Sequence, residues 1–446
     1  MIPLAPIPLA RHACPGCARP LRAVGFRVPG MRCLAALECP PCGRSFYGDL
    51  PSGHGLYYPM LLDRATGEVT GPAMGAWFGA WLRDGWRHRT SDPVPLEVER
   101  LRPVRRPLLL NCLDGIYGHA LLKLLNAQGH LARHAAYDLV VLVPRFLRWM
   151  VPAGAAEVWT VDLPLRRGAG WYDWLADDVA RRLPGPAMLS VGTGLPNARD
   201  VDIERFTGVA PFPERRLGEP VERAVVTFVL RNDRPWGADP LDAANRGIVG
   251  WSRRAAERVR LAPSGTARQL RRVARFGEAL RALWPDLDLA VTGLGERGGL
   301  PDWIGDLRGP RPTPADERAA CARFAASHLV LGVHGSNMLL PSAHAAATLE
   351  IAWGPNLDNA FQDLLLRRQD PRIAAFRSRV LPGETTPDTL AAHAASLLRC
   401  GPQANRFAPE WNDHDRLTRD PFALAEGAWR HPPADRPGPP DPGAGA

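Results

Sequence analysis

The sequence predicts a mixed α/β protein in which two parallel-sheet domains follow a small metal-binding module. Two Cys-x-x-Cys pairs lie near the start of the chain, and two sets of alternating strand-like and helix-like segments follow them. A segment with three prolines, 211–220, separates the two sets. Such alternation is typical of parallel sheets with helices on both faces, so we expect two Rossmann-like domains preceded by a zinc ribbon.

Size and composition are those of a soluble globular chain. The 446 residues suffice for two cores, with 46% hydrophobic and 23% charged residues. No apolar run reaches the roughly 18 residues of a membrane span. Residues 1–10 lack the basic start and long apolar stretch of a secretory signal, so we expect a cytoplasmic protein. The net charge of +9, almost all from arginine, suits an anionic ligand such as a nucleotide or a nucleic acid.

The metal-binding module is defined by Cys14-Pro-Gly-Cys17 and Cys39-Pro-Pro-Cys42, with 21 residues between the pairs. Each turn directs two thiolates at one ion, and two such turns complete the tetrahedral site of a zinc ribbon. Four cysteine ligands leave no position for water, so we expect a structural zinc ion and no catalytic metal. Two disulfides or free thiols are the alternative, and Cys33 is a substitute ligand.

The chain divides into five expected regions. They are the zinc-ribbon module (1–60), a connector (61–105), the first Rossmann-like domain (106–215), the second (221–400) and a disordered tail rich in proline and glycine (431–446). Aromatic residues in the connector predict an amphipathic helix packed on the main body, with a base-stacking platform as the alternative: Trp77, Phe78, Trp81 and Trp86.

The elements of both domains follow from short apolar runs and helical periodicity. In the first domain we expect strands at 107–112, 139–143, 157–162 and 187–191, and helices at 120–128 and 171–183. In the second domain we expect strands at 225–230, 287–292, 329–333 and 348–352, and helices at 268–284, 315–327 and 337–346. Ligands of such sheets bind beyond the carboxyl ends of the strands, here between the domains.

One loop at such a strand end has the features of a ligand site. The run His334-Gly335-Ser336-Asn337 follows a strand and opens a helix. Gly335 allows close approach of the backbone to a ligand, and Ser336 and Asn337 are expected to cap the helix and to donate to phosphate oxygens. The alternative is a plain N-cap at Ser336 and a turn residue at His334.

The stretch 317–353 around this loop resembles the donor-site region of GT-B type glycosyltransferases, and in particular glycosyltransferase family 61. The resemblance implies a GT-B architecture in which this loop binds a nucleotide-sugar donor. It carries over donor-binding roles to His334, Gly335, Ser336 and Asn337, and it places Glu350 near the ribose.

A second candidate site follows the first strand of the second domain. Arg231, and next Arg234, are expected to face the cleft and clamp a pyrophosphate, because a guanidinium binds phosphate oxygens in pairs. Positive charge there would stabilise the departing nucleoside diphosphate. A surface ion pair with Asp233 is the alternative.

Asp114 and His119 follow the first strand of the first domain, and either is a candidate general base for an acceptor hydroxyl. A capping or packing histidine is the alternative. A glycine-rich segment, 293–298, matches G-x-G-x-x-G, but Gly299 and Pro301 follow in place of a helix. We therefore expect a cleft loop there and not a dinucleotide site.

Together these features predict an enzyme that transfers a sugar from a nucleotide-sugar donor to a carbohydrate or glycoconjugate acceptor. No transmembrane segment and no nucleic-acid partner are expected. Two alternatives stay open: a polysaccharide pyruvyltransferase-like enzyme, and a zinc-ribbon nucleic-acid- or protein-binding protein with degenerate Rossmann lobes.

Overall fold

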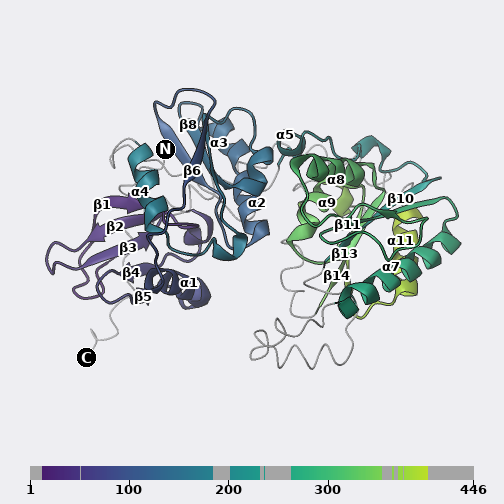
Figure 1. Ribbon diagram of the computed structural model, residues 1–446, viewed down its shortest axis with the longest axis horizontal. Coiled ribbons are helices and arrows are strands. Elements are labelled where there is room, and N and C mark those ends of the chain that lie inside the picture. Colours follow the sequence, from purple (N-terminus) through teal and green to yellow (C-terminus); the bar gives the residue numbers. More distant parts are fainter. Residues whose placement is uncertain are drawn as a thin grey trace, which may run out of the picture.

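The computed structural model describes residues 13–50, 52–183, 201–231, 236, 263–353, 364–365, 370–374 and 376–399. These residues form two lobes, with α5 (Glu204–Thr207) between them (Figure 1). No helix within these ranges has the length and apolar character needed to cross a bilayer. The strand expected at 187–191, the side chain of Arg234 and the tail 431–446 lie outside the described residues.

The chain begins with a five-stranded antiparallel sheet in the order β1-β2-β3-β4-β5. Its strands are β1 (Arg22–Arg27), β2 (Leu34–Glu38), β3 (Ser45–Asp49), β4 (Leu61–Asp63) and β5 (Val69–Thr70). One cysteine pair precedes β1 and the other joins β2 to β3. The expected boundary at residue 60 is wrong, because β4 and β5 complete this sheet; strands of three and two residues are too short for a periodic signal.

The expected aromatic helix is α1 (Ala76–Arg87), preceded by the short 3-10 helices η2 (Gly53–Leu56) and η3 (Ala73–Gly75). Phe78 and Leu82 on α1 are buried against Leu34 of β2 and Leu62 of β4. The connector helix therefore packs on the antiparallel sheet.

The second sheet of the first lobe has the order β6-β9-β8-β7. Its strands are β6 (Leu96–Arg100), β7 (Pro107–Asn111), β8 (Asp138–Pro144) and β9 (Glu157–Val161), with β7, β8 and β9 parallel and β6 antiparallel at the edge. The helices of this part are α2 (Tyr117–Leu125), α3 (Ala127–Arg133) and α4 (Asp173–Arg182), with 3-10 turns η4 (Arg145–Met150) and η5 (Leu165–Arg167).

Both sheets of the first lobe share one apolar core. Phe46 of the antiparallel sheet lies in the same buried cluster as Leu109 of β7, Val140 of β8 and Leu175 of α4. The opposite face of the four-stranded sheet packs on α2 and α3. The segment 61–105, expected as a connector, instead supplies strands to both sheets, so the metal-binding module and the first α/β unit form one body.

The second lobe is built on six parallel strands in the order β12-β11-β10-β13-β14-β15. They are β10 (Ala224–Leu230), β11 (Leu287–Gly293), β12 (Gly305–Asp306), β13 (Leu329–Val333), β14 (Thr348–Ala352) and β15 (Ser378–Pro382). Numbered along the chain, this is the order 3-2-1-4-5-6 of a doubly wound Rossmann sheet. Within the described ranges the first lobe instead has a smaller, mixed sheet.

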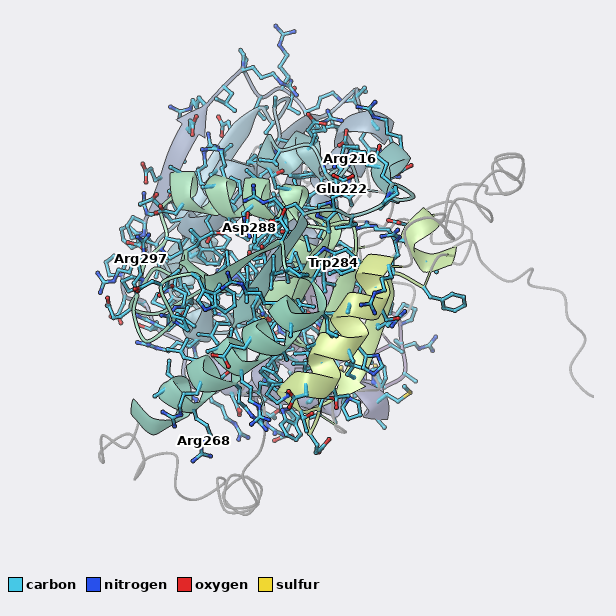
Figure 2. All side chains as sticks on the ribbon, turned by 90° about the vertical axis from the view of Figure 1, so that its right-hand side faces the viewer. Arg216, Glu222, Arg268, Trp284, Asp288 and Arg297 are labelled. Atoms are coloured by element: carbon cyan, nitrogen blue, oxygen red, sulfur yellow. The ribbon has the colours of Figure 1, made fainter. Side chains whose placement is uncertain are left out.

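Helices cover both faces of this parallel sheet (Figures 1 and 2). The long helices α7 (Pro263–Leu283) and α11 (Pro387–Arg399) pack side by side on one face, where Phe228 is buried against Phe276. On the other face Val229 packs with Phe324 of α8 (Pro314–Ala326). The chain also forms α9 (Leu339–His344), α10 (Pro371–Ala374), η7 (Glu214–Arg216) and η8 (Ser336–Met338). Strands buried on both faces explain the continuous apolar runs in the sequence.

The two lobes meet through a packed apolar contact. Leu121 of α2 lies in one buried cluster with Leu339 and Leu340 of α9. A β-carbon added at Gly118 would come within 2.6 Å of the Ser336 side chain, so only glycine permits this approach. The contact brings the start of α2 against the loop that follows β13.

Candidate functional site

A cleft of about 910 Å³ opens at the carboxyl ends of the second lobe's strands. Its walls include Arg231 after β10, Thr292 at the end of β11, and Ser336 and Asn337 after β13; Tyr117 of the first lobe closes one side. The strands β10 and β13 are neighbours, and the chain leaves them toward opposite edges of the sheet. This is the topological switch point, where open α/β sheets bind their ligands.

Arg231 ties the two strand ends at this point together. Its Nη1 donates to the carbonyl oxygen of His334 at 3.0 Å and to Oδ1 of Asn337 at 2.9 Å. The backbone of Arg231 is itself held, because Nε2 of Gln269 donates to its carbonyl oxygen at 2.8 Å. The guanidinium also lines the cleft. It is therefore fixed in place at the mouth of the switch point.

The loop after β13 differs from its expected form. Gly335 has φ 142° and ψ −179°, a conformation that L-residues with side chains rarely adopt. Residues Ser336–Met338 form a 3-10 turn, α9 begins only at Leu339, and Ser336 caps no helix. The expected helix 337–346 is thus split, and the predicted capping role of Ser336 and Asn337 is wrong. Both side chains instead line the cleft.

His334 and Glu350 lie beneath this loop and not at its surface. Nδ1 of His334 is 2.6 Å from Oε2 of Glu350, and their side chains are 1% and 0% exposed. The Glu350 carboxylate is fully buried and is not among the residues that line the cleft, so its expected contact with a ribose stays a prediction. A buried, charge-assisted contact of this length fixes the orientation of the histidine whose carbonyl oxygen accepts from Arg231.

The glycine motif at 293–298 forms another wall of the cleft. Gly293 has φ 125°, and a β-carbon there would meet the Leu230 carbonyl oxygen at 2.4 Å. Strand β12 follows this loop and a helix does not, in agreement with the expectation that it is not a dinucleotide fingerprint. Arg297 and Arg311 line the cleft from this side. Sequence reasoning missed both.

Arg308 holds the glycine loop from below. Its guanidinium is buried, pairs with Asp306 at 2.6 Å, and donates to the carbonyl oxygen of Gly298 at 2.6 Å. The hydrogen bond from Arg308 lowers the pKa of Asp306 below its usual range. No sequence signal separates this buried arginine from the exposed ones nearby.

In the first lobe, Asp114 is an ionised, buried carboxylate. Its side chain is 0% exposed and lies 2.7 Å from Nζ of Lys123 and 3.4 Å from Nδ1 of His119. Burial alone would raise the pKa of Asp114, but Lys123 and His119 hold it well below its usual range. So weak a base does not fit the role of proton acceptor near neutral pH. Asp114 instead lies beside His119, whose ring is 14% exposed.

A second histidine, His54 of η2, completes this group and was missed from the sequence. Its ring centroid is 4.6 Å from that of His119, and its other neighbours are Trp77 and Phe78 of α1. Burial, and next the charge of His119, lower the pKa of His54 to about 4. A histidine in a short Gly-His-Gly turn gives no periodic signal, so only the fold brings it beside His119.

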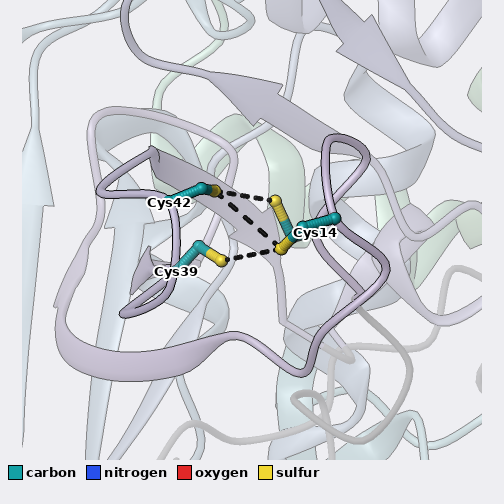
Figure 3. A group of neighbouring side chains, drawn as sticks. Cys14, Cys39 and Cys42 are labelled. Carbon is teal, nitrogen blue, oxygen red and sulfur yellow. Dashed lines mark hydrogen bonds between the residues drawn. The ribbon is translucent and has the colours of Figure 1, made fainter.

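The four cysteines of the N-terminal module come together as the spacing predicts (Figure 3). The sulfur of Cys14 is 3.5 Å from that of Cys42, and the sulfur of Cys17 is 3.4 Å from Cys39 and 3.9 Å from Cys42. A tetrahedral zinc ion with bonds of about 2.3 Å places its sulfurs about 3.8 Å apart. Four thiols at these distances fit one metal ion. Cys33 stands apart, where Nδ2 of Asn111 donates to its sulfur.

No family model matches the chain, and no curated protein matches it in sequence. Among solved structures the chain is similar to "Spinosyn Forosaminyltransferase SpnP", with 12% sequence identity and a TM-score of 0.24 over 73% of this chain and 76% of that one. Similarity at this level does not establish a shared fold. Strand order and cleft position define the class: an α/β protein with a doubly wound sheet, a cleft at its switch point and four clustered cysteines that could hold a metal ion.

Proposed function

We propose that this protein is a GT-B type glycosyltransferase that takes its sugar from a nucleotide-linked donor and passes it to a hydroxyl of a carbohydrate or glycoconjugate acceptor. The observation that carries the proposal is the position of the cleft. It lies at the switch point of the doubly wound sheet, and the first lobe closes its open side through Tyr117.

The donor half of the proposal rests on size and charge. A volume of about 910 Å³ is within the range of ligand pockets. Arg231, Arg297 and Arg311 line the cleft, and guanidinium groups suit phosphate oxygens. A diphosphate leaving group gains charge in the transition state, so fixed positive charge there lowers the barrier. Gly335, Ser336 and Asn337 would contact the donor, and His334 and Glu350 would hold their loop.

The acceptor half rests on the contact between the lobes. Gly118 packs closely on Ser336, so α2, which also carries His119, begins beside the proposed donor loop. We propose His119 as the general base that takes the proton of the acceptor hydroxyl. Asp114 would stabilise the imidazolium that forms, in the way that a buried carboxylate assists a catalytic histidine.

The four cysteines would hold a structural zinc ion, because four thiolates leave it no open position. The site lies at the edge of a core shared with β7, β8 and β9. Removal of the ion with a chelator should therefore lower the melting temperature of the whole first lobe. A melting curve unchanged by chelation, with fewer than one zinc ion per chain, would contradict the assignment.

The donor is tested by thermal-shift and calorimetric titration with uridine, guanosine, thymidine and other nucleoside diphosphates, because a ligand of the native state raises its apparent stability. The proposal expects one of them to bind and its sugar derivative to be turned over. Phosphoenolpyruvate turnover would instead show a pyruvyltransferase. Salt-sensitive binding of nucleic acid without nucleotide binding would show a nucleic-acid-binding protein.

A further inference from the structure

The group formed by His54, Asp114 and His119 has a second property beyond the proposed transfer. Each residue offers one ligand atom, and the three atoms lie within 4.8 Å of one another. They come from separate parts of the first lobe, because His54 belongs to η2, Asp114 follows β7 and His119 belongs to α2. We infer that these residues form a second metal site, for a divalent transition metal ion such as zinc.

Unpaired polar atoms point to an occupant. His54 is 8% exposed, and its Nδ1 has no hydrogen-bond partner among the described residues. Nδ1 of His119 is also buried, and its 3.4 Å distance from Asp114 exceeds the usual 2.7–3.2 Å or so of a hydrogen bond. A polar nitrogen that is buried without a partner destabilises the fold. One ion between the rings would satisfy both nitrogens.

The ligand set selects the class of ion. Two imidazoles and one carboxylate are ligands of zinc and other transition metals, whereas calcium and magnesium prefer oxygen alone. Three protein ligands leave a coordination position open, as in catalytic sites and unlike the four-cysteine site. With an ion bound, His119 would be a ligand in place of a general base, and the ion would itself lower the pKa of a water or acceptor hydroxyl in the open position.

Lys123 does not exclude the ion. Its Nζ lies 2.7 Å from Oδ2 of Asp114 and donates to the Leu113 carbonyl oxygen at 3.0 Å, so the other carboxylate oxygen faces His119. The backbone N–H of Ile116 donates to that oxygen at 3.1 Å. Such contacts around a ligand carboxylate fix its orientation. The charges of Asp114 and Lys123 cancel each other. The site with its ion would therefore carry the same +2 charge as zinc held by three neutral imidazoles.

The inference is tested by metal content. After loading with zinc and removal of the excess, wild-type protein should hold two zinc ions per chain by mass spectrometry of the metal. His54→Phe keeps an aromatic ring against Trp77 and Phe78 but removes both nitrogens, and it should hold one. The matched control is His88→Ala, which removes an exposed histidine whose Nδ1 hydrogen-bonds the Asp84 carbonyl oxygen. This variant should still hold two zinc ions. One ion per chain in all three proteins would overturn the inference.

A second measurement does not depend on a variant that folds. Cobalt(II) added to wild-type protein from which a mild chelator has removed all but one zinc ion per chain should fill the nitrogen–oxygen site, and it should give weak visible bands without thiolate charge-transfer bands. Absence of these bands at saturating cobalt(II) would overturn the inference. Neither outcome depends on nucleotide binding, so failure here leaves the proposed transfer intact.

Discussion

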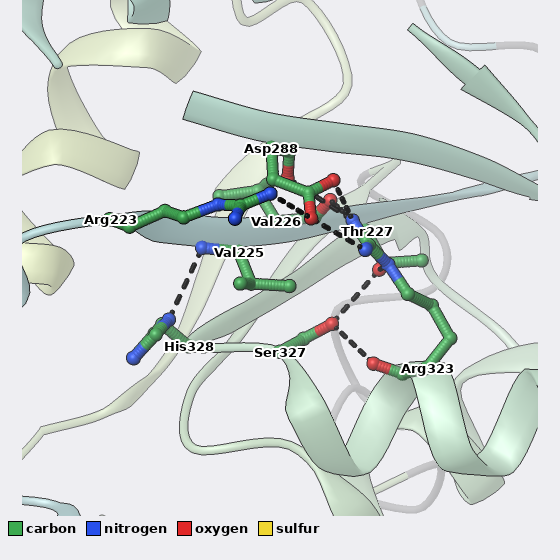
Figure 4. A network of polar contacts seen from close by, with 8 residues as sticks. All are labelled: Arg223, Val225, Val226, Thr227, Asp288, Arg323, Ser327 and His328. Atoms are coloured by element: carbon green, nitrogen blue, oxygen red, sulfur yellow. Dashed lines mark hydrogen bonds and ion pairs between the residues drawn. The ribbon is translucent and has the colours of Figure 1, made fainter. Parts of the chain in front are cut away.

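The two ends of the second lobe's parallel sheet use their charges in opposite ways. At the amino end, Asp288 accepts from Arg323 at 2.9 and 3.1 Å and pairs with Arg223 at 3.4 Å (Figure 4). Arg323 also donates to the hydroxyl of Thr227 at 3.0 Å, and that hydroxyl bonds Ser327 at 2.9 Å. Every charge in this network has a protein partner.

At the carboxyl end of the same strands the charges surround a cleft. Arg297 lies beyond the end of β11, whereas Asp288 lies near the start of that strand (Figure 2). Arg231 is braced by its Nη1 contacts, yet its side chain lines the cleft. Charge at the amino end is thus paired within the protein, whereas arginines at the carboxyl end line a cleft, where we propose that they bind the donor. Substitutions at the two ends should therefore separate stability from function.

The largest effect is expected at His119. Replacement by alanine should lower the transfer rate by about 10²–10⁴-fold, the usual contribution of general acid–base catalysis. Nucleoside diphosphate affinity should stay unchanged, because the donor loop belongs to the other lobe. Single-turnover rates and calorimetry measure the two quantities, and His88→Ala is the control. A near-normal rate in His119→Ala would place the base elsewhere.

The next effect is expected at the carboxyl end of the sheet. Arg231→Ala should weaken nucleoside diphosphate binding by about 1.5–3 kcal/mol, the range for a hydrogen bond to a charged group. Arg231→Lys keeps the positive charge but loses the paired donors, so its nucleoside diphosphate affinity should lie between those of wild type and Arg231→Ala. Arg275→Ala removes an exposed arginine of α7 that pairs with Asp388, and it should change nothing. Equal affinity for wild type and Arg231→Ala would remove Arg231 from the site.

The reverse pattern is expected at the amino end. Arg323→Leu leaves Asp288 with its weaker partner Arg223 and removes the donor to Thr227. Urea unfolding should show a loss of about 1–3 kcal/mol, the cost of a part-buried polar group left without its partner. Nucleotide affinity of the folded variant should equal that of wild type. A stable variant that no longer binds nucleotide would break the proposed division between the two ends.

The smallest effect concerns pH. The hydrogen bond from Arg323 lowers the pKa of Asp288, so this pair stabilises the fold above the unfolded pKa of about 3.9 and loses its effect as pH falls through the folded value. Because Asp288 is part-exposed, the contribution at pH 7 should be only about 0.2–1 kcal/mol. The stability difference between wild type and Asp288→Asn should therefore shrink between pH 5 and about pH 2. A difference that grows on acidification would contradict the assignment.

Elements with long apolar or amphipathic patterns could be predicted from the sequence, and those formed by tertiary contact could not. The observed bounds of β10, β13 and α8 lie within one or two residues of the expected bounds. The two-residue β12 has no such pattern. That Arg231 and Ser336 lie at the cleft could be predicted, because each follows a predicted strand. The burial of Glu350 could not be predicted, because the surroundings of a strand residue depend on its neighbours in the sheet.

The group of His54, Asp114 and His119 also combines contacts that the sequence predicts with contacts that only the fold creates. Asp114 and His119 are close in sequence, so their proximity could be predicted. The ion pair with Lys123, one of several effects that set the pKa of Asp114, depends on the packing of α2. His54 reaches the group from η2, in the connection between β3 and β4, and no local pattern links it to residue 119.

Hydrogen–deuterium exchange with and without a saturating nucleoside diphosphate tests the central claim most directly. We expect slower exchange at both cleft loops, in residues 293–297 and 335–338, and no change in the amino-end segments 223–227 and 286–289. The amino-end segments enter β10 and β11 of the same sheet, so they serve as the control for the cleft loops. Protection confined to the amino end, or no protection at any saturating nucleotide, would contradict a nucleotide site at the switch point.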